Sequence, residues 1–206
     1  MKTERISAEN LIAAIVTARE VFEKKGGIVA FPTDTVYGIG APVRSRAIEY
    51  LFEAKGRPYS KPIGVLMADA SGLPQVAAKI SDHAKKLAQR FWPGPLTLVL
   101  PRHPEIAWFL SKNDTIGIRV PDHPVAHALL AAIGPMAVTS ANRSGQENAL
   151  NADQVMAQLN GWVHLVIDGG QTPGDQPSTV VDMTGEEPKI LRVGPISEAE
   201  IRAALA

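Results

Sequence analysis

The sequence predicts an α/β (α+β) protein in which helices pack on a mixed β-sheet. Segments whose apolar residues recur at helical spacing alternate along the chain with short apolar runs typical of strands. Several of these runs follow one another with only a loop between them, which argues against a purely parallel barrel. The 17 Gly and 16 Pro residues are spread between the runs, so the fold should contain many turns.

The first half of the chain is expected to alternate helix and strand. Ser7 is placed to cap a helix whose apolar positions continue to Phe22, and Gly26 and Gly27 supply its stop. The apolar run 28–31 then continues as a strand. The other elements expected here are helices at 47–54 and 81–91, the second beginning at Ser81, and strands at 63–67 and 96–100.

The second half continues the same alternation. Asn151 is placed to cap one helix, and Ser197 with Glu200 three residues later forms a capping box for the last helix. The elements expected here are helices at 124–133 and 152–159 and strands at 116–120, 136–139, 165–168, 179–182 and 189–193.

Composition limits the classes of function. A chain of 206 residues, 45% of them hydrophobic, can bury one sizeable core, so we expect one domain over residues 1–206. Lys plus Arg and Asp plus Glu both total 21, so any polyanion must be held by a local cluster rather than by overall charge. The absence of Cys excludes disulfides and thiolate catalysis. With neither a signal peptide nor a membrane-spanning segment, the chain is expected to be cytoplasmic and to have no membrane partner.

Four polar segments, each placed where an apolar run ends, predict one anion site. They are Thr33-Asp34-Thr35, Lys55-Gly56-Arg57-Pro58, Thr139-Ser140-Ala141-Asn142 and Ser178-Thr179. A buried strand delivers the residue after it to the sheet edge, where backbone amides and short hydroxyls can meet a ligand. Lys and Arg on a loop suit phosphate oxygens, although a solvated basic turn would have the same composition.

Arg119 lies within an otherwise apolar strand, where a guanidinium is costly to bury without an acidic partner. A ligand carboxylate and a structural ion pair are equally good explanations. Gly38 and Gly40 would let the backbone approach a ligand, but they lack the spacing of a dinucleotide fingerprint. No P-loop and no GxSxG motif occurs. His123 and His127 share a helix face without a third ligand, so no metal site made of protein ligands is expected.

Six motifs together resemble the YrdC family of L-threonylcarbamoyladenylate synthases. They are Phe-Pro-Thr-Asp-Thr-Val-Tyr-Gly at 31–38, Lys-Gly-Arg-Pro at 55–58, Phe-Trp-Pro-Gly-Pro-Leu-Thr at 91–97, Ile-Arg-Val-Pro at 118–121, Thr-Ser-Ala-Asn at 139–142 and Ser-Thr-Val at 178–180. They occur in family order between about Val21 and Pro195. The resemblance implies a twisted mixed sheet around a concave, positively lined cavity. The resemblance is expected to be to the single-domain form of the family, without the additional carboxy-terminal domain of longer relatives.

The resemblance also implies the reaction and its residues. Threonine, bicarbonate or CO₂ and ATP would give threonylcarbamoyl-adenylate and pyrophosphate, the first step toward threonylcarbamoyladenosine in tRNA. Mg²⁺ would arrive with the nucleotide, and downstream tRNA threonylcarbamoyl-transferase proteins would be partners, with tRNA or double-stranded RNA as a further contact. The implied threonine site is Thr33, Thr115, Arg119 and Ser178; the implied ATP site is Lys55, Arg57, Ser140, Asn142, Asn148 and Arg192, with Lys55 and Arg57 also catalytic.

Two other readings stay open. An RNA-binding or ribosome-maturation protein of the same fold could hold a phosphate backbone in the same cavity, with an affinity that falls steeply with salt. An enzyme that activates a different amino acid would differ only in which amino acid supports pyrophosphate formation.

Overall fold

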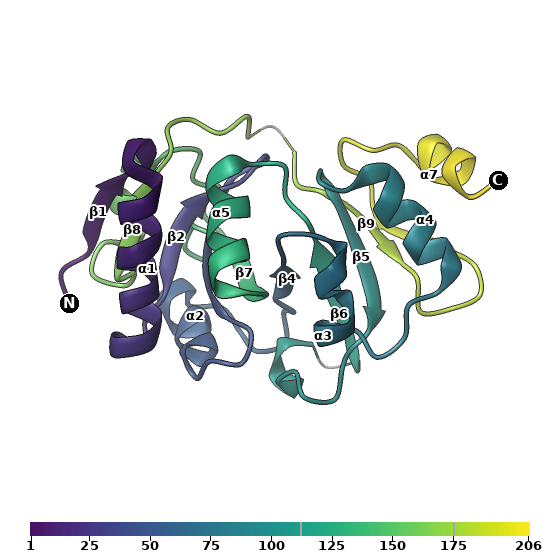
Figure 1. Cartoon of the computed structure of the whole chain (residues 1–206), viewed down its shortest axis with the longest axis horizontal. Helices are drawn as coiled ribbons and strands as arrows, with labels where there is room; N and C mark the ends of the chain where they lie inside the picture. The colour runs from purple at the N-terminus through teal and green to yellow at the C-terminus, as the bar shows by residue number, and fades with distance from the viewer. Residues whose placement is uncertain (112, 175) are drawn as a thin grey trace.

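A ten-stranded mixed β-sheet runs through the computed structural model, which describes residues 1–111, 113–174 and 176–206 (Figure 1). The strand order is β1-β8-β2-β3-β7-β4-β6-β5-β9-β10, and the sheet combines parallel pairs, such as β4 with β6, and antiparallel pairs, such as β3 with β7. The mixed sheet expected from the sequence is therefore confirmed. The strands are β1 (Glu4–Ser7), β2 (Val29–Pro32), β3 (Tyr37–Pro42), β4 (Gly64–Leu66), β5 (Leu96–Pro101), β6 (Thr115–Arg119), β7 (Met136–Ser140), β8 (Leu165–Asp168), β9 (Thr179–Asp182) and β10 (Lys189–Arg192).

Helices cover both faces of the sheet. Figure 1 shows α1 and α5 side by side in front of the sheet, and α4 and α7 at the right of the view near β5 and β9. Helix α1 contacts α5, and α4 contacts α7. The helices are α1 (Leu11–Lys25), α2 (Ala47–Lys55), α3 (Leu73–Val76), α4 (Asp82–Phe91), α5 (Pro124–Ile133), α6 (Ala152–Leu159) and α7 (Glu198–Leu205). Among the described residues, no helix is long and apolar enough to cross a membrane.

Helix caps show why several boundaries could be read from the sequence. The side chains of Ser81 and Asn151 accept backbone N–H groups at the starts of α4 and α6, and Ser197 forms the expected capping box with Glu200. Ser7 was the wrong cap for α1. It caps a short 3-10 turn (Ala8–Asn10), and Asn10 caps α1 instead.

Strands β1 and β3 were not expected from the sequence. In β1 the buried and exposed positions do not alternate clearly, because this edge strand pairs only with β8. Two glycines and a terminal proline give the segment of β3 a low strand propensity, so the sequence does not indicate a strand there. Tyr37, Ile39 and Ala41 are nevertheless fully buried on one face. Backbone pairing with β2 and β7 therefore forms β3 despite its low strand propensity.

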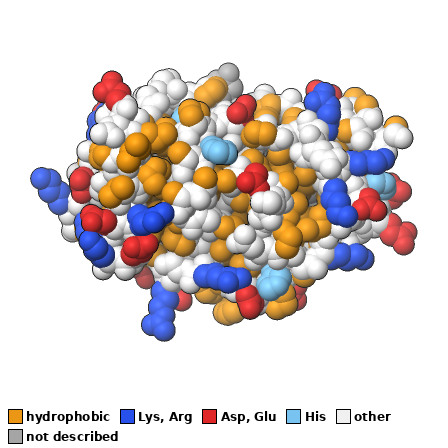
Figure 2. All heavy atoms as spheres, in the orientation of Figure 1, with side chains coloured by type: hydrophobic (Ala, Val, Ile, Leu, Met, Phe, Trp, Pro, Cys, Tyr) orange, Lys and Arg blue, Asp and Glu red, His pale blue; other side chains and the backbone are white. Residues whose placement is uncertain are grey.

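The core consists of two clusters on opposite faces of the sheet. One packs α1 and α5 on residues such as Phe31 and Met136, and the other places α2, α4, α6 and α7 over residues such as Leu98 and Ile118. Figure 2 shows hydrophobic side chains gathered over α1, where Ile12 and Val16 are 79% and 56% exposed. Residues such as Thr97, Gly117 and Arg192 belong to neither cluster and line a hollow against the sheet instead.

Candidate active site

A cavity of about 660 Å³ opens over the part of the sheet formed, in sheet order, by β3, β7, β4, β6, β5, β9 and β10. Three glycines line it: Gly38 of β3, Gly64 of β4 and Gly117 of β6. A Cβ atom on Gly38 would lie 2.7 Å from Val138 Cγ1, and one on Gly64 would lie 3.1 Å from the Gly117 carbonyl oxygen. Part of the lining is therefore bare backbone, at positions where a side chain would clash with the neighbouring strand.

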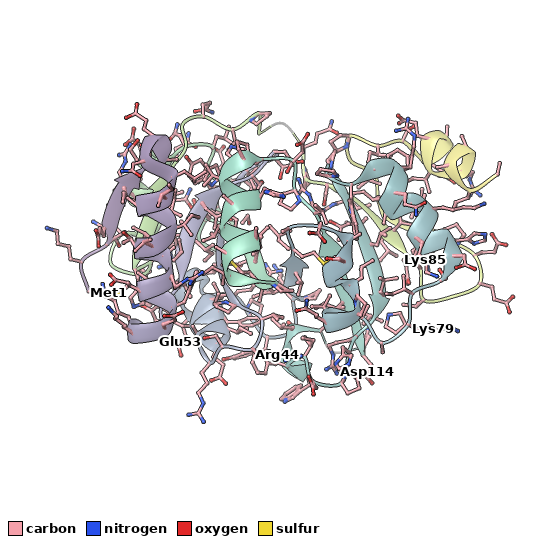
Figure 3. The ribbon with its side chains drawn as sticks, viewed as in Figure 1. Met1, Arg44, Glu53, Lys79, Lys85 and Asp114 are labelled. Carbon is pink, nitrogen blue, oxygen red and sulfur yellow. The ribbon has the colours of Figure 1, made fainter. Side chains whose placement is uncertain are left out.

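The cavity is positively lined although the chain as a whole is neutral. Arg57, Arg119 and Arg192 face it, and no Asp or Glu is found among the described residues that line it. Charged side chains outside the site, such as Arg44 and Asp114 labelled in Figure 3, are mostly exposed to solvent (61% and 91%). Three cations around one hollow without a lining carboxylate form a site for an anionic ligand.

Arg119 lies at the end of β6 and is bound by three protein groups. Its Nε donates to the Gly94 carbonyl oxygen (3.0 Å), one terminal nitrogen donates to Thr35 Oγ1 (3.1 Å), and the other forms an ion pair with Asp34. The structural ion pair considered for this residue is thus present, and Arg119 also lines the cavity. A guanidinium has five N–H donors, so two of them are free for a ligand.

Arg192 reaches the cavity from β10. Its guanidinium donates to the Ser178 carbonyl oxygen from Nε (3.0 Å) and from a terminal nitrogen (2.9 Å), and the Ser178 hydroxyl pairs with Thr97 Oγ1 (2.7 Å). Burial lowers the pKa of Arg192, and the nearby positive charge of Arg119 lowers it further. These two cations lie close enough to repel each other, and an anion between them would relieve that repulsion.

Arg57 extends from the loop after α2. It donates to the carbonyl oxygens of Lys61 (3.3 Å) and Pro62 (2.8 Å), which fold the loop back beside the cavity. Burial lowers the pKa of this guanidinium. Most of its N–H donors stay free to meet phosphate oxygens.

Lys55, only 2% exposed, lies behind the cavity wall. Its Nζ donates to the Ser140 and Asn142 carbonyl oxygens and to Asn142 Oδ1 (2.9 Å). Burial lowers the pKa of Lys55 to about 7, and the charge of Arg57 contributes in the same direction. Lys55 thus joins the end of α2 to the turn that follows β7.

The structure brings most of the expected site residues together. Lys55 and Asn142 are both buried and do not line the cavity; they contact each other directly beneath it. The expected residues that line it are Thr33, Arg57, Thr115, Arg119, Ser140, Asn148, Ser178 and Arg192.

Several residues that line the cavity were not identified from the sequence as site residues, among them Gly64, Thr97 and Gly117. Gly64 and Gly117 are glycines inside strands, a pattern that indicates close backbone approach. Thr97 is a hydroxyl residue within an otherwise apolar strand. His123 and His127 are not part of the cavity lining: His123 accepts the Val125 N–H at the start of α5.

Comparison with known proteins gives one consistent family. A model of the Sua5/YciO/YrdC family, described as "Telomere recombination", matches residues 22–194. A putative threonylcarbamoyl-AMP synthase of Mycobacterium tuberculosis is 42% identical over 184 residues, covering 88% of this chain and 85% of that protein. The threonylcarbamoyl-AMP synthase of Bacillus subtilis is 40% identical over 189 residues, but this chain spans only 54% of its length.

Solved structures agree with this result. The crystal structure of Pyrococcus abyssi Sua5 complexed with L-threonine superposes with a TM-score of 0.91 at 36% identity, covering all of this chain and 61% of that one. Escherichia coli YciO gives a TM-score of 0.81 at 28% identity, with 97% and 98% of the two chains covered. The family match spans most of the chain and includes both the Lys55-x-Arg57 loop and the Ser140-x-Asn142 turn, so the chain belongs to the Sua5/YciO/YrdC family.

Proposed function

We propose that this protein is an L-threonylcarbamoyladenylate synthase, which forms threonylcarbamoyl-AMP and pyrophosphate from L-threonine, bicarbonate or CO₂ and ATP. The observation that carries the proposal is the cavity with three arginines and no carboxylate among its described lining residues. Its volume of about 660 Å³ lies within the range of nucleotide and cofactor sites. The synthase names of the mycobacterial and Bacillus relatives support the same reaction, and nothing comparable favours the RNA-binding alternative.

Threonine would bind around Arg119. The two free N–H donors of this guanidinium suit a carboxylate, and the Asp34 ion pair fixes its orientation. Thr33, Thr115 and Ser178 line the same cavity and would surround the amino acid with hydroxyl groups. The threonine complex of the archaeal Sua5 supports a threonine site in this fold.

ATP would lie between Arg57 and Arg192, with Ser140 and Asn148 at the same wall. Mg²⁺ would arrive on the phosphates, because the described residues contain no group of three or more His, Asp or Glu side chains placed to hold a metal. The ion would neutralise part of the phosphate charge. Lys55 and Asn142 would support the ATP half of the site without lining the cavity, since they bond to each other behind its wall.

The chemistry needs positioning and charge neutralisation. The neutral threonine amine attacks CO₂ and loses a proton to solvent, giving a carbamate. A carbamate oxygen then attacks the α-phosphorus, and the bond from that phosphorus to the pyrophosphate oxygen breaks. Two anions must meet in this step, so the cationic wall lowers the barrier by neutralising their repulsion. No protein nucleophile is needed.

The proposal predicts pyrophosphate release that requires ATP, bicarbonate and threonine together, with threonylcarbamoyl-AMP detected by mass spectrometry. Serine in place of threonine is the matched substrate control. Salt-sensitive RNA binding without any pyrophosphate release would overturn the proposal in favour of the RNA-binding alternative.

Arg57→Ala should lower the rate of pyrophosphate release by about 100-fold or more, because it removes a cation that meets developing charge. Its unfolding free energy should change by less than about 1 kcal/mol. Lys61→Ala is the matched control, because Lys61 is an exposed cation of the same loop that does not line the cavity. Equal activity of the two variants would contradict this assignment of Arg57.

A further inference from the structure

The ammonium group of Lys55 has no donor to spare for a ligand. Its Nζ lies 2.7 Å from the Asn142 carbonyl oxygen and 2.9 Å from Asn142 Oδ1, and it also donates to the Ser140 carbonyl oxygen. The Ser140 hydroxyl is a fourth, more distant neighbour at 3.3 Å. An ammonium has three N–H donors, so these oxygens use all of them.

Asn142 is occupied in the same way. Its Oδ1 accepts from Lys55 Nζ and from Ser140 Oγ (2.6 Å), while its Nδ2 donates to the carbonyl oxygens of Arg143 (3.1 Å) and Gln146 (2.6 Å). Its side chain therefore has no unused N–H donor. The backbone repeats the link, because the Ser144 N–H donates to the Lys55 carbonyl oxygen at 2.8 Å.

The two signature segments thus divide their residues in one pattern. Arg57 and Ser140 line the cavity, whereas Lys55 and Asn142 are 2% and 6% exposed and lie behind it. Lys55 and Arg57 are two positions apart in one segment, and Ser140 and Asn142 are two positions apart in the other. In each segment one residue faces the cavity, and the other connects the two segments.

We propose that Lys55 is a positioning residue, which holds the turn at 140–144 against the end of α2 and thereby places Ser140 and Arg57 without touching the nucleotide. The proposal rests on the proposed function for the identity of the nucleotide. A direct phosphate contact would require Nζ to leave three buried oxygens, and those oxygens would then lack a donor.

The first test is a double-mutant cycle on ATP affinity, measured by calorimetry. Lys55→Met and Asn142→Ala should each weaken ATP binding by about tenfold. The ATP affinity of the double variant should be within about twofold of that of the single variant that binds ATP less tightly. Threonine affinity should stay within about twofold of wild type, which a general loss of structure would not allow. Arg192→Met is the matched control, because Arg192 reaches the cavity from β10 and bonds to neither Lys55 nor Asn142, so its effect should multiply with that of Asn142→Ala.

The second test does not need ATP. Amide hydrogen exchange of Ser144 and Gln146 should speed up about tenfold or more in Lys55→Met and stay unchanged in Arg57→Met. If wild-type protein binds no ATP, the proposed function fails, and this measurement alone decides the role of Lys55. Lys55→Gln, which keeps two donors, serves in both tests if Lys55→Met does not fold.

Two results would overturn the proposal. One is a multiplicative loss of ATP affinity when Lys55→Met is combined with Asn142→Ala, as expected for an independent phosphate contact. The other is unchanged exchange at Ser144 and Gln146 in a folded Lys55 variant.

Discussion

Arg119 illustrates how one side chain can serve both the fold and a ligand. It forms an ion pair with Asp34 in which the side chains are only 9% and 14% exposed, so water screens the charges weakly. Removing one member of a shielded pair leaves the other charge without a partner and without full hydration. Surface pairs lack this penalty because water replaces the lost partner.

Arg119→Met should therefore lower the free energy of unfolding by about 3 kcal/mol, measured by urea denaturation. Arg44→Met is the matched control, because the Arg44–Glu105 pair has side chains 61% and 63% exposed, and its cost should stay below about 1 kcal/mol. Similar small losses in both variants would show that the Asp34 pair contributes little to stability.

Residue chemistry explains which site residues the sequence could predict. Arg119 was recognisable because a cation inside an apolar strand requires a partner, and both partners considered for it are compatible with the structure. The sequence could not predict that the Lys55 side chain points away from the cavity. Where this side chain points depends on how the end of α2 packs against the turn after β7, and Lys55 and Ser140 are 85 residues apart in the chain.

Among the elements, those with strong local signals were predicted best. Helices α4 and α6 combine a side-chain cap with helical spacing of apolar residues, and they begin where the sequence indicated. Strand β3 has no such signal, since Gly38 and Gly40 weaken strand propensity. Those glycines serve the close packing of β3 on β7, which only the assembled sheet reveals.

Two histidines stabilise element ends only when neutral. Nδ1 of His123 accepts the Val125 N–H at the start of α5, and Nδ1 of His164 accepts the Ile28 N–H just before β2 (both 3.2 Å). Burial lowers the pKa of both, against the opposing influence of Asp34 and Asp122 on His123. A lowered pKa means that the unfolded chain takes up protons at a higher pH than the folded chain does.

The free energy of unfolding should therefore be fully retained above about pH 6.5 and decline as the pH falls below that value, because the unfolded chain then binds more protons than the folded chain. His123→Asn keeps a capping acceptor that does not titrate, so its decline should be shallower. Urea denaturation at several pH values checks this. A slope identical to that of wild type would exclude His123 as a contributor.

At the scale of the whole molecule, the cavity gathers residues from Thr33 to Arg192 over much of the sheet's width. Overall neutrality keeps this positive hollow from being part of a general polyanion-binding surface. A ligand in the cavity would contact strands from both halves of the sheet, an arrangement that exists only in the folded state. Ligand affinity and global stability are therefore linked.

ATP at 100 times its dissociation constant should raise the free energy of unfolding by about 2.7 kcal/mol, seen as a higher thermal midpoint. Arg192→Met should reduce the shift at the same ATP concentration, whereas Lys61→Ala should leave it unchanged. A midpoint that millimolar ATP does not move in any variant would contradict nucleotide binding.

The position of β10 has a consequence for protein synthesis. Arg192 belongs to this edge strand, which pairs with β9, and β9 in turn lies beside β5 from the middle of the chain. While the ribosome still holds the β9–β10 hairpin, the earlier strands can begin to pair but Arg192 has not arrived. The nascent polypeptide should thus stay catalytically silent until β10 has left the ribosome and paired with β9.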